Sequence, residues 1–233
     1  MARDSVGASG LEELYPFLYS GTSDLDAVLT QVRQSTVEKA REIVALRRQV
    51  LETDGERLAA CARDLAQAFA GGGRLLAFGN GGSSTDAQDL ASLFLSPDSL
   101  DSPDGDARPL PAFGLTNDIA VVTALSNDIG FDVVFSRQVA AFGRRGDIAV
   151  GLSTSGNSAN LLSAFDEAAR RGLVTVGIAG YDGGKMAELR SIDHLFVVPS
   201  PSVHRIQEAQ TTLYHALWEL TLGALDDLEG EQP

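Results

Sequence analysis

The sequence predicts an α/β protein built on a parallel sheet that is covered by helices on both faces. Short apolar runs that suit buried strands, of which Leu173–Ile178 is the most β-like, alternate with stretches of helical periodicity such as Ala159–Arg171. Strands joined by helical crossovers run parallel, and a parallel sheet is normally covered on both faces. The 233 residues suffice for one large domain with its own core.

The chain ahead of this alternation is expected to be helical. Residues 1–23 carry glycines and serines around a small apolar patch, and we interpret them as an N-terminal extension. Residues 24–70 are expected to form two helices with a break near Gly55, because apolar residues recur at helical spacing on either side of it. Two helices without strands suit an oligomerisation arm, and they suit packing on their own domain equally well.

The remaining elements follow in alternation and complete a single domain over residues 24–225. The expected strands are Arg74–Phe78, Ala112–Leu115, Asp147–Leu152, Leu173–Ile178 and His194–Val198. The expected helices are Ser83–Phe94, a segment capped by Asp118 that ends at Leu125, Phe131–Phe142, Ala159–Arg171, Lys185–Arg190 and His204–Leu225. A loop rich in Asp, Pro and Ser spans residues 96–111, and residues 226–233 are expected to form an acidic tail.

Composition excludes several classes of partner. The formal net charge of −14 argues against nucleic acid, because binding to a phosphate backbone needs a surface rich in lysine and arginine. No apolar stretch is long enough to span a membrane, and no basic segment followed by an apolar run opens the chain, so we expect a cytoplasmic protein. The one cysteine, Cys61, lies in an apolar helical pattern and is expected in the core.

Three polar turns follow predicted strands, where ligands bind in open parallel sheets. The first is the segment 79–84, Gly-Asn-Gly-Gly-Ser-Ser. Its glycines would let the backbone approach a ligand, and the helix that follows offers free N–H groups to an anion. The same residues also suit a plain tight turn. The residues of the third turn, Tyr181–Lys185, are fully explained by a turn that leads into a short helix.

The second turn, Ser153–Ser158, is the stronger candidate. It concentrates four hydroxyl side chains at the start of a predicted helix, whereas an N-cap needs only one. Each hydroxyl can donate to a phosphate oxygen, and the helix dipole favours the dianion. The segment contains no lysine or arginine, so neutral donors would bind a phosphate monoester.

These turns, in this order, resemble the sugar isomerase (SIS) domain, and they match the phosphoheptose isomerases most closely. The resemblance extends from about residue 24 to residue 222. Its motifs are GNGGS at 79–83, the pair Asp86–Ala87, SNDIGFDVVFSRQV at 126–139, GDIAVGLSTSGNS at 146–158, DGGKMA at 182–187 and RIQE at 205–208. The N-terminal 23 residues and the long loop 96–111 have no clear counterpart in the family.

The resemblance implies a three-layer sandwich with a five-stranded parallel sheet. It also implies a homotetramer assembled through the N-terminal helices, with active sites at subunit interfaces and a phosphorylated sugar as ligand. It assigns phosphate binding to Ser83, Ser153, Thr154, Ser155 and Ser158. Asn80 and Gly81 would line the sugar, and Asn127 and Asp128 would lie near the sugar chain.

The family interconverts sedoheptulose 7-phosphate and D-glycero-D-manno-heptose 7-phosphate, which needs a base to move a proton between neighbouring carbons. In the family, a His and a Glu on the helix after GNGGS take part, and a Gln and a His on the last helix complete a zinc site. The second pair is present here as Gln207 and His215. The first pair is replaced by Asp89 and Leu93, and leucine can neither abstract a proton nor bind a cation.

This departure leaves two functions open. In one explanation, a His and a carboxylate have exchanged positions, so that Asp89 and His204 rebuild a zinc site with Gln207 and His215. In the other, the same residues are chance substitutions in a site that has lost its function. Among the remaining groups, His215, Glu208 and Asp89 are the candidate catalytic residues. The chain is then an isomerase with an altered site, or it is a non-catalytic sensor of sugar phosphates or a regulatory interaction module.

Overall fold

A computed structural model describes residues 25–96 and 109–230, and it confirms the expected α/β sandwich. The sheet has five parallel strands in the order β2-β1-β3-β4-β5. Their bounds are β1 Leu75–Gly79, β2 Ala112–Gly114, β3 Ile148–Ser153, β4 Val174–Gly180 and β5 His194–Val198. Each expected strand is present within about two residues of its expected ends, the usual scatter of element boundaries.

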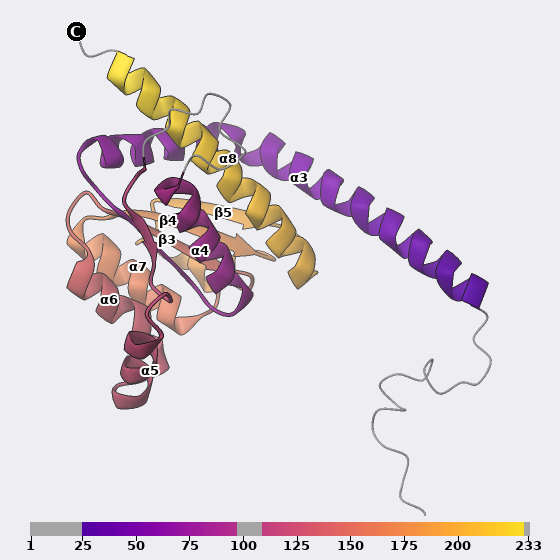
Figure 1. The fold of residues 1–233 in the computed structure, drawn as a ribbon, viewed down its shortest axis with the longest axis horizontal. Helices are drawn as coiled ribbons and strands as arrows, with labels where there is room; N and C mark the ends of the chain where they lie inside the picture. Colours follow the sequence, from indigo (N-terminus) through magenta and orange to yellow (C-terminus); the bar gives the residue numbers. More distant parts are fainter. Residues whose placement is uncertain (1–24, 97–108, 231–233) are drawn as a thin grey trace, which may run out of the picture. The chain divides into compact units, whose positions relative to one another are not determined.

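Helices cover both faces of this sheet (Figure 1). α4 and α8 pack on one face, and α6 and α7 pack on the other. The helical bounds are α3 Leu25–Ala70, α4 Gly82–Leu95, α5 Ile119–Asp128, α6 Val134–Phe142, α7 Ala159–Arg171 and α8 Val203–Gly230, with short 3-10 turns η1 at Phe131–Val133 and η2 at Gly184–Glu188. The side chain of Asp118 caps α5 as expected, since its carboxylate accepts the N–H groups of Ala120 and Val121.

The core explains why these strands are apolar throughout. Every residue of β1 and of β3 is buried, as expected for central strands of a sheet that is covered twice. On the face covered by α6 and α7, the ring of Phe78 lies 5.5 Å from that of Phe135 and 5.3 Å from that of Phe165. This packing fixes the carboxyl ends of β1 and β3, where the polar turns begin.

The expected break near Gly55 is absent, because α3 is one helix of 46 residues. A glycine inside a helix costs only about 1 kcal/mol relative to alanine, and packing easily offsets that amount. Asp54 beside it is buried and forms an ion pair with Arg57, which holds the turn in helical form. The chain divides by its internal contacts into residues 1–44 and 45–233, so the first turns of α3 form a unit of their own.

The acidic tail is also different from the expectation. α8 continues to Gly230, so residues 226–230 are helical and only residues 231–233 lie outside the described part. The N-terminal extension and residues 97–108 of the predicted loop also lie outside the described residues. Cys61 is fully buried, as expected. Within the described ranges, no helix has both the length and the apolar composition that crossing a membrane requires.

Candidate functional site

The two hydroxyl-bearing turns meet at the point where the chain changes direction in the sheet. From β1 the chain crosses outward to β2, and it then returns to β3 on the other side of β1. Loops that follow two strands at such a switch point separate from one another and leave a crevice for a ligand. We call residues 79–83 the β1 loop and residues 153–158 the β3 loop.

The β1 loop is a tight turn that leads directly into α4. Gly79 is required because a side-chain carbon there would collide with the backbone carbonyl of Ser83. Gly81 has a φ of 55°, in the left-handed region that favours glycine. Ser83 is buried, and its backbone N–H donates to the carbonyl of Asn80 over 3.0 Å. The turn therefore places the start of α4 over the end of β1.

Asn80 joins the two sides of the crevice. Its amide nitrogen donates to Oδ1 of Asn160 over 3.0 Å, and the amide nitrogen of Asn160 donates back to Oδ1 of Asn80 over 2.9 Å. Asn160 lies in the first turn of α7 and is itself buried. Of this pair, the family resemblance predicts only Asn80 as a residue that lines the sugar. Asn160 lies at the start of a helical apolar pattern, which gives no separate signal for it. The amide pair fixes the position of Asn80 relative to α7.

The β3 loop holds its shape through its own hydroxyls and one glycine. Oγ of Ser153 accepts the N–H of Gly156 over 3.1 Å, and Oγ of Ser155 accepts the N–H of Asn157 over 3.2 Å. Gly156 has a φ of 65°. Ser158 occupies the N-cap of α7, yet its side chain makes no capping hydrogen bond. Its hydroxyl is therefore not used to cap the helix.

The third turn braces the β3 loop. A side-chain carbon on Gly156 would collide with the carbonyl of Gly183, and the N–H of Met186 donates to the carbonyl of Gly156 over 3.0 Å. The N–H of Lys185 donates to Oδ1 of Asn157 over 3.0 Å. The turn that the sequence explained as a plain connection thus fixes the geometry of the loop beside it.

A second cluster of polar side chains lies between α4 and α8. We call Asp86, Asp89, Tyr214 and His215 the α4–α8 seam. The hydroxyl of Tyr214 donates to Oδ2 of Asp89 over 2.7 Å, and Nε2 of His215 lies 3.6 Å from the same oxygen. The rings of Tyr214 and His215 stack with their centroids 5.2 Å apart. Two of the three candidate catalytic residues, Asp89 and His215, are thus neighbours.

The electrostatics of the seam distinguish Asp86, which the sequence predicts only as part of the Asp86–Ala87 motif. Burial, together with the negative charge of Asp89, raises the pKa of Asp86 to about 6. One of its carboxylate oxygens is buried and has no hydrogen-bond partner among the described residues. Burial and the hydrogen bond to Asp89 also raise the pKa of Tyr214, so its hydroxyl stays protonated and remains a donor. The spacing of Asp86 and Asp89, which places both on one helical face, was the available signal.

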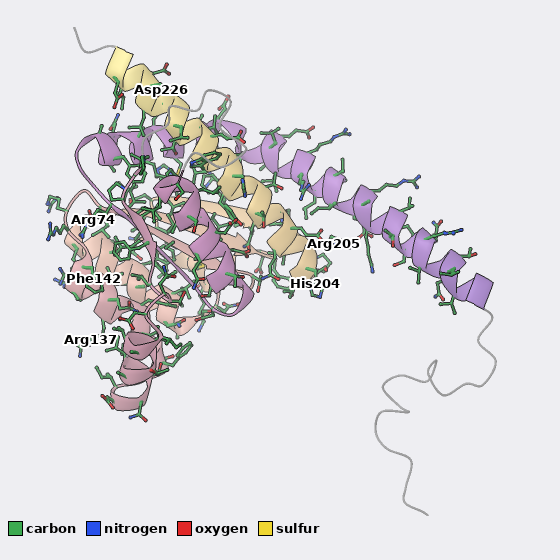
Figure 2. All side chains as sticks on the ribbon, in the orientation of Figure 1. Arg74, Arg137, Phe142, His204, Arg205 and Asp226 are labelled. Atoms are coloured by element: carbon green, nitrogen blue, oxygen red, sulfur yellow. The ribbon has the colours of Figure 1, made fainter. Side chains whose placement is uncertain are left out.

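The structure does not gather the other expected residues into this seam. His204 lies in the first turn of α8 (Figure 2), and at 1.5 Å per residue it stands about 16 Å along the helix from His215. The carboxylate of Glu208 pairs with Arg205 over 2.8 Å. Asn127 donates to Asp128 over 2.8 Å at the end of α5, which packs on η1 and α6. None of the contacts described for these four residues joins them to the seam.

Gln207 and Leu93 are two further residues at positions that the family resemblance assigns to the site. Gln207 lies over the start of α4, since a side-chain carbon on Gly82 would collide with its amide. Leu93 is 8% exposed and packs as an apolar side chain one turn beyond Asp89. Among the described residues, no group of three or more His, Cys, Asp or Glu side chains is placed to hold a metal ion. Asp89 and His215, two of the residues expected to bind zinc, lie near one another, and His204 stands apart from His215 along α8.

Comparisons with known proteins place this geometry in context. The family described as the SIS domain matches residues 40–180. A phosphoheptose isomerase of Desulfovibrio desulfuricans is 45% identical over 183 residues, which cover 78% of this chain and 83% of the relative. One from Burkholderia pseudomallei is 42% identical over 80% of this chain and 90% of its own length.

Solved structures agree with the sequence comparison. The phosphoheptose isomerase of Neisseria gonorrhoeae superposes with a TM-score of 0.72 at 37% identity, covering 82% of this chain and 99% of that one. A phosphoheptose isomerase from Francisella tularensis gives a TM-score of 0.71 at 29% identity, covering 86% of this chain and 98% of that one. The SIS-domain match at residues 40–180 includes the β1 loop, the β3 loop and α4.

Proposed function

The chain belongs to the SIS-domain family, and from that premise we propose that it binds a phosphorylated sugar with the phosphate on the β3 loop. The observation that carries the proposal is the hydroxyl-rich loop at the start of α7, in which Ser158 occupies the N-cap without capping the helix. The N-terminus of α7 supplies backbone N–H groups and a favourable dipole for a dianion. Ser83 and Thr154 are further donors on the two loops that meet there.

The relatives are named phosphoheptose isomerases, so we propose a heptose phosphate as the sugar. Isomerisation moves a proton between the first two carbons of the chain and another between their oxygens, with no net gain or loss of atoms. Asp89 and His215 are the acid–base groups that lie close together, and Glu208 is the remaining candidate. We propose that turnover is slow, because Leu93 occupies the position of a carboxylate that the family uses.

A non-catalytic sugar-phosphate sensor is the second candidate, and the burial of Leu93 favours it. An apolar, well-packed side chain at that position contributes to stability and contributes nothing to proton transfer. Both candidates require the phosphate site, so binding and turnover have to be measured separately.

Zinc remains a prediction for this chain. Asp89, His215 and Gln207 offer oxygen and nitrogen donors, which suit zinc. Asp89 and His215 lie close together, whereas Gln207 stands about 12 Å and His204 about 16 Å along α8 from His215. An assay with and without added zinc decides whether one is needed.

We further propose a homotetramer that uses α3 as an interface. The exposed apolar side chains of this helix are Val28, Leu29, Val32, Val37, Val44 and Leu51. Within residues 45–233, an apolar groove lies between α3 and α8, lined among others by Val50, Leu58 and Leu213. Light scattering at micromolar concentration tests the proposal, and a monomer would contradict it. Leu51→Glu, a change on the exposed rim of the groove, is expected to shift the protein towards smaller species.

Isothermal calorimetry with sedoheptulose 7-phosphate tests the phosphate site. Ser155→Ala and Ser158→Ala are each expected to weaken binding by about 1 kcal/mol or more, the scale of a hydrogen bond to a charged group. Ser163→Ala is the matched control, because this serine lies one turn further along α7 and donates to the carbonyl of Ala159. Unchanged affinity in the Ser155→Ala, Ser158→Ala double variant would contradict the placement.

A further inference from the structure

An open depression lies beside the β3 loop, on the loops that follow the last three strands. Its walls are Ser155 and Asn157 after β3, Tyr181 and Asp182 after β4, and residues 199–201 after β5. No residue of the α4–α8 seam lines it. The proposed phosphate chemistry leaves Tyr181, Asp182 and residues 199–201 without a role.

Tyr181 is the unusual member of this surface. Its φ of 54° is in the left-handed region, and within the described residues it is the one side-chain-bearing residue with a positive φ. Glycine or asparagine takes this conformation readily, whereas a large aromatic residue is strained in it. The side chain is 39% exposed, so burial in the core does not offset the strain. Strain at an exposed aromatic residue points to a functional position.

The walls of the depression are held rigidly before any ligand arrives. Oδ1 of Asp182 accepts the N–H of Gly184 over 3.1 Å. The side chain of Asn157 donates to the carbonyl of Ser155 over 2.9 Å while it accepts the N–H of Lys185. Proline rings at 199 and 201 stiffen the third wall. A preorganised surface of this kind binds a ligand without a large loss of conformational entropy.

The lining defines the chemistry of the ligand. It combines an aromatic ring and two proline rings with the hydroxyls of Ser155 and Ser200 and the carboxylate of Asp182. Among the described residues that line it, none is basic, and a carboxylate repels a second phosphate. A neutral sugar ring fits, since its C–H face packs on an aromatic ring and its hydroxyls donate to a carboxylate.

We propose that this depression is a binding subsite for a neutral sugar ring, stacked on Tyr181 and hydrogen-bonded to Asp182. The inference goes beyond the proposed function, because it concerns a different ligand and depends on Tyr181 and Asp182. Ser155 lines both sites, whereas Ser158 does not line the depression. The probe is methyl α-D-mannopyranoside, added to the full chain and followed through the backbone amide resonances. Saturable shifts confined to the loops after β3, β4 and β5 are expected, with millimolar affinity.

Three variants separate the role of the ring from the role of the turn. Tyr181→Gly removes the ring and relieves the strained backbone, so it is expected to weaken binding about tenfold while the melting temperature stays equal or rises. Tyr181→Phe keeps the ring and is expected to retain most of the affinity. Asp182→Asn retains an acceptor for Gly184 and removes the charge, so a smaller loss is expected.

Failure of this subsite and failure of the phosphate site give different results. Ser158→Ala is expected to weaken binding of sedoheptulose 7-phosphate and to leave the affinity for methyl α-D-mannopyranoside unchanged. Tyr181→Gly is expected to weaken binding of the mannoside and to leave the affinity for sedoheptulose 7-phosphate unchanged. Shifts that do not saturate, or that spread over the surface, would overturn the proposal. So would equal affinity of the parent and the Tyr181→Gly protein.

Discussion

The β3 loop and the α4–α8 seam are held in shape by different atoms. In the loop, glycine backbones, main-chain hydrogen bonds and short hydroxyl side chains set the geometry. In the seam, the geometry depends on which side chains α4 and α8 present, and Tyr214, Asp89 and His215 form one contact group. A substitution on a helix face therefore changes the chemistry of the seam and leaves the loop intact. We therefore expect phosphate binding and proton transfer to be separable on this scaffold.

The strongest test of that separation is turnover. We expect conversion of sedoheptulose 7-phosphate to be slower than in an ordinary isomerase by a factor of about 100 to 10,000, the effect of removing a general base. The double variant Leu93→Glu, Asp89→His is expected to gain activity. Leu93→Gln, Asp89→His is the matched control, since it has the same size and lacks the carboxylate. Turnover by the parent near 1 per second or faster, on the order of ordinary enzyme rates, would contradict the prediction.

Glycine replacement tests the loop half of the comparison. Gly156→Ala is expected to destabilise the protein by about 2 to 5 kcal/mol, because the new carbon meets the carbonyl of Gly183 and the φ of 65° is unfavourable. Gly81→Ala, also at positive φ, meets nothing within 4 Å and is expected to cost only about 1 kcal/mol. Urea unfolding measures both. Equal losses would show that the brace from Gly183 does not matter.

The same contrast explains how much the sequence revealed. Strands, helices and the two hydroxyl-bearing turns were predictable, because apolar periodicity and glycine–serine clusters are local signals. The contact between Tyr214 and Asp89 joins residues 125 positions apart and depends on how α4 and α8 pack. The brace from Gly183 to Gly156 also depends on neighbouring strands. The continuous α3 was missed because tertiary packing overrides the small helical penalty of Gly55.

Asp86 gives the seam a pH dependence that the loop lacks. Its pKa is raised from 3.8 to about 6 in the folded protein, so between these values the folded state holds more protons than the unfolded chain. Stability is therefore expected to fall as pH rises from about 4 to about 6 and to stay lower above that range. Because Asp86 is only half-buried, solvent screening reduces the effect to the order of 1 kcal/mol.

Asp86→Asn is expected to remove this slope and to be more stable than the parent at pH 7 by a similar amount. Thermal unfolding from pH 4 to pH 7 measures it. Asp226→Asn, near the C-terminal end of α8 (Figure 2), controls for the loss of one negative charge. A slope that persists unchanged in Asp86→Asn would assign the effect to other groups.

Tyr214→Phe removes a single contact of the seam. The variant loses the hydrogen bond to Asp89, and the carboxylate, which is 53% exposed, can turn to water instead. We expect a loss of about 0.5 to 1 kcal/mol in urea unfolding. A double-mutant cycle with Asp89→Asn isolates the pair. Additive losses in the cycle would mean that the contact contributes nothing to stability.

Ser158→Ala is expected to have the smallest effect on stability, and it tests the role of the β3 loop most directly. Replacing a serine that caps a helix usually costs about 1 kcal/mol, because an N–H group loses its acceptor. Ser158 stands at the N-cap of α7 and makes no such bond, so the loss is expected to be only a few tenths of a kcal/mol. Affinity for sedoheptulose 7-phosphate is expected to fall at the same time.

Asp118→Ala, at the N-cap of α5, is the matched control with a true cap, since its carboxylate accepts two backbone N–H groups. If Ser158→Ala loses as much stability as Asp118→Ala, the Ser158 hydroxyl caps the helix. The main evidence for a ligand on the β3 loop would then be removed.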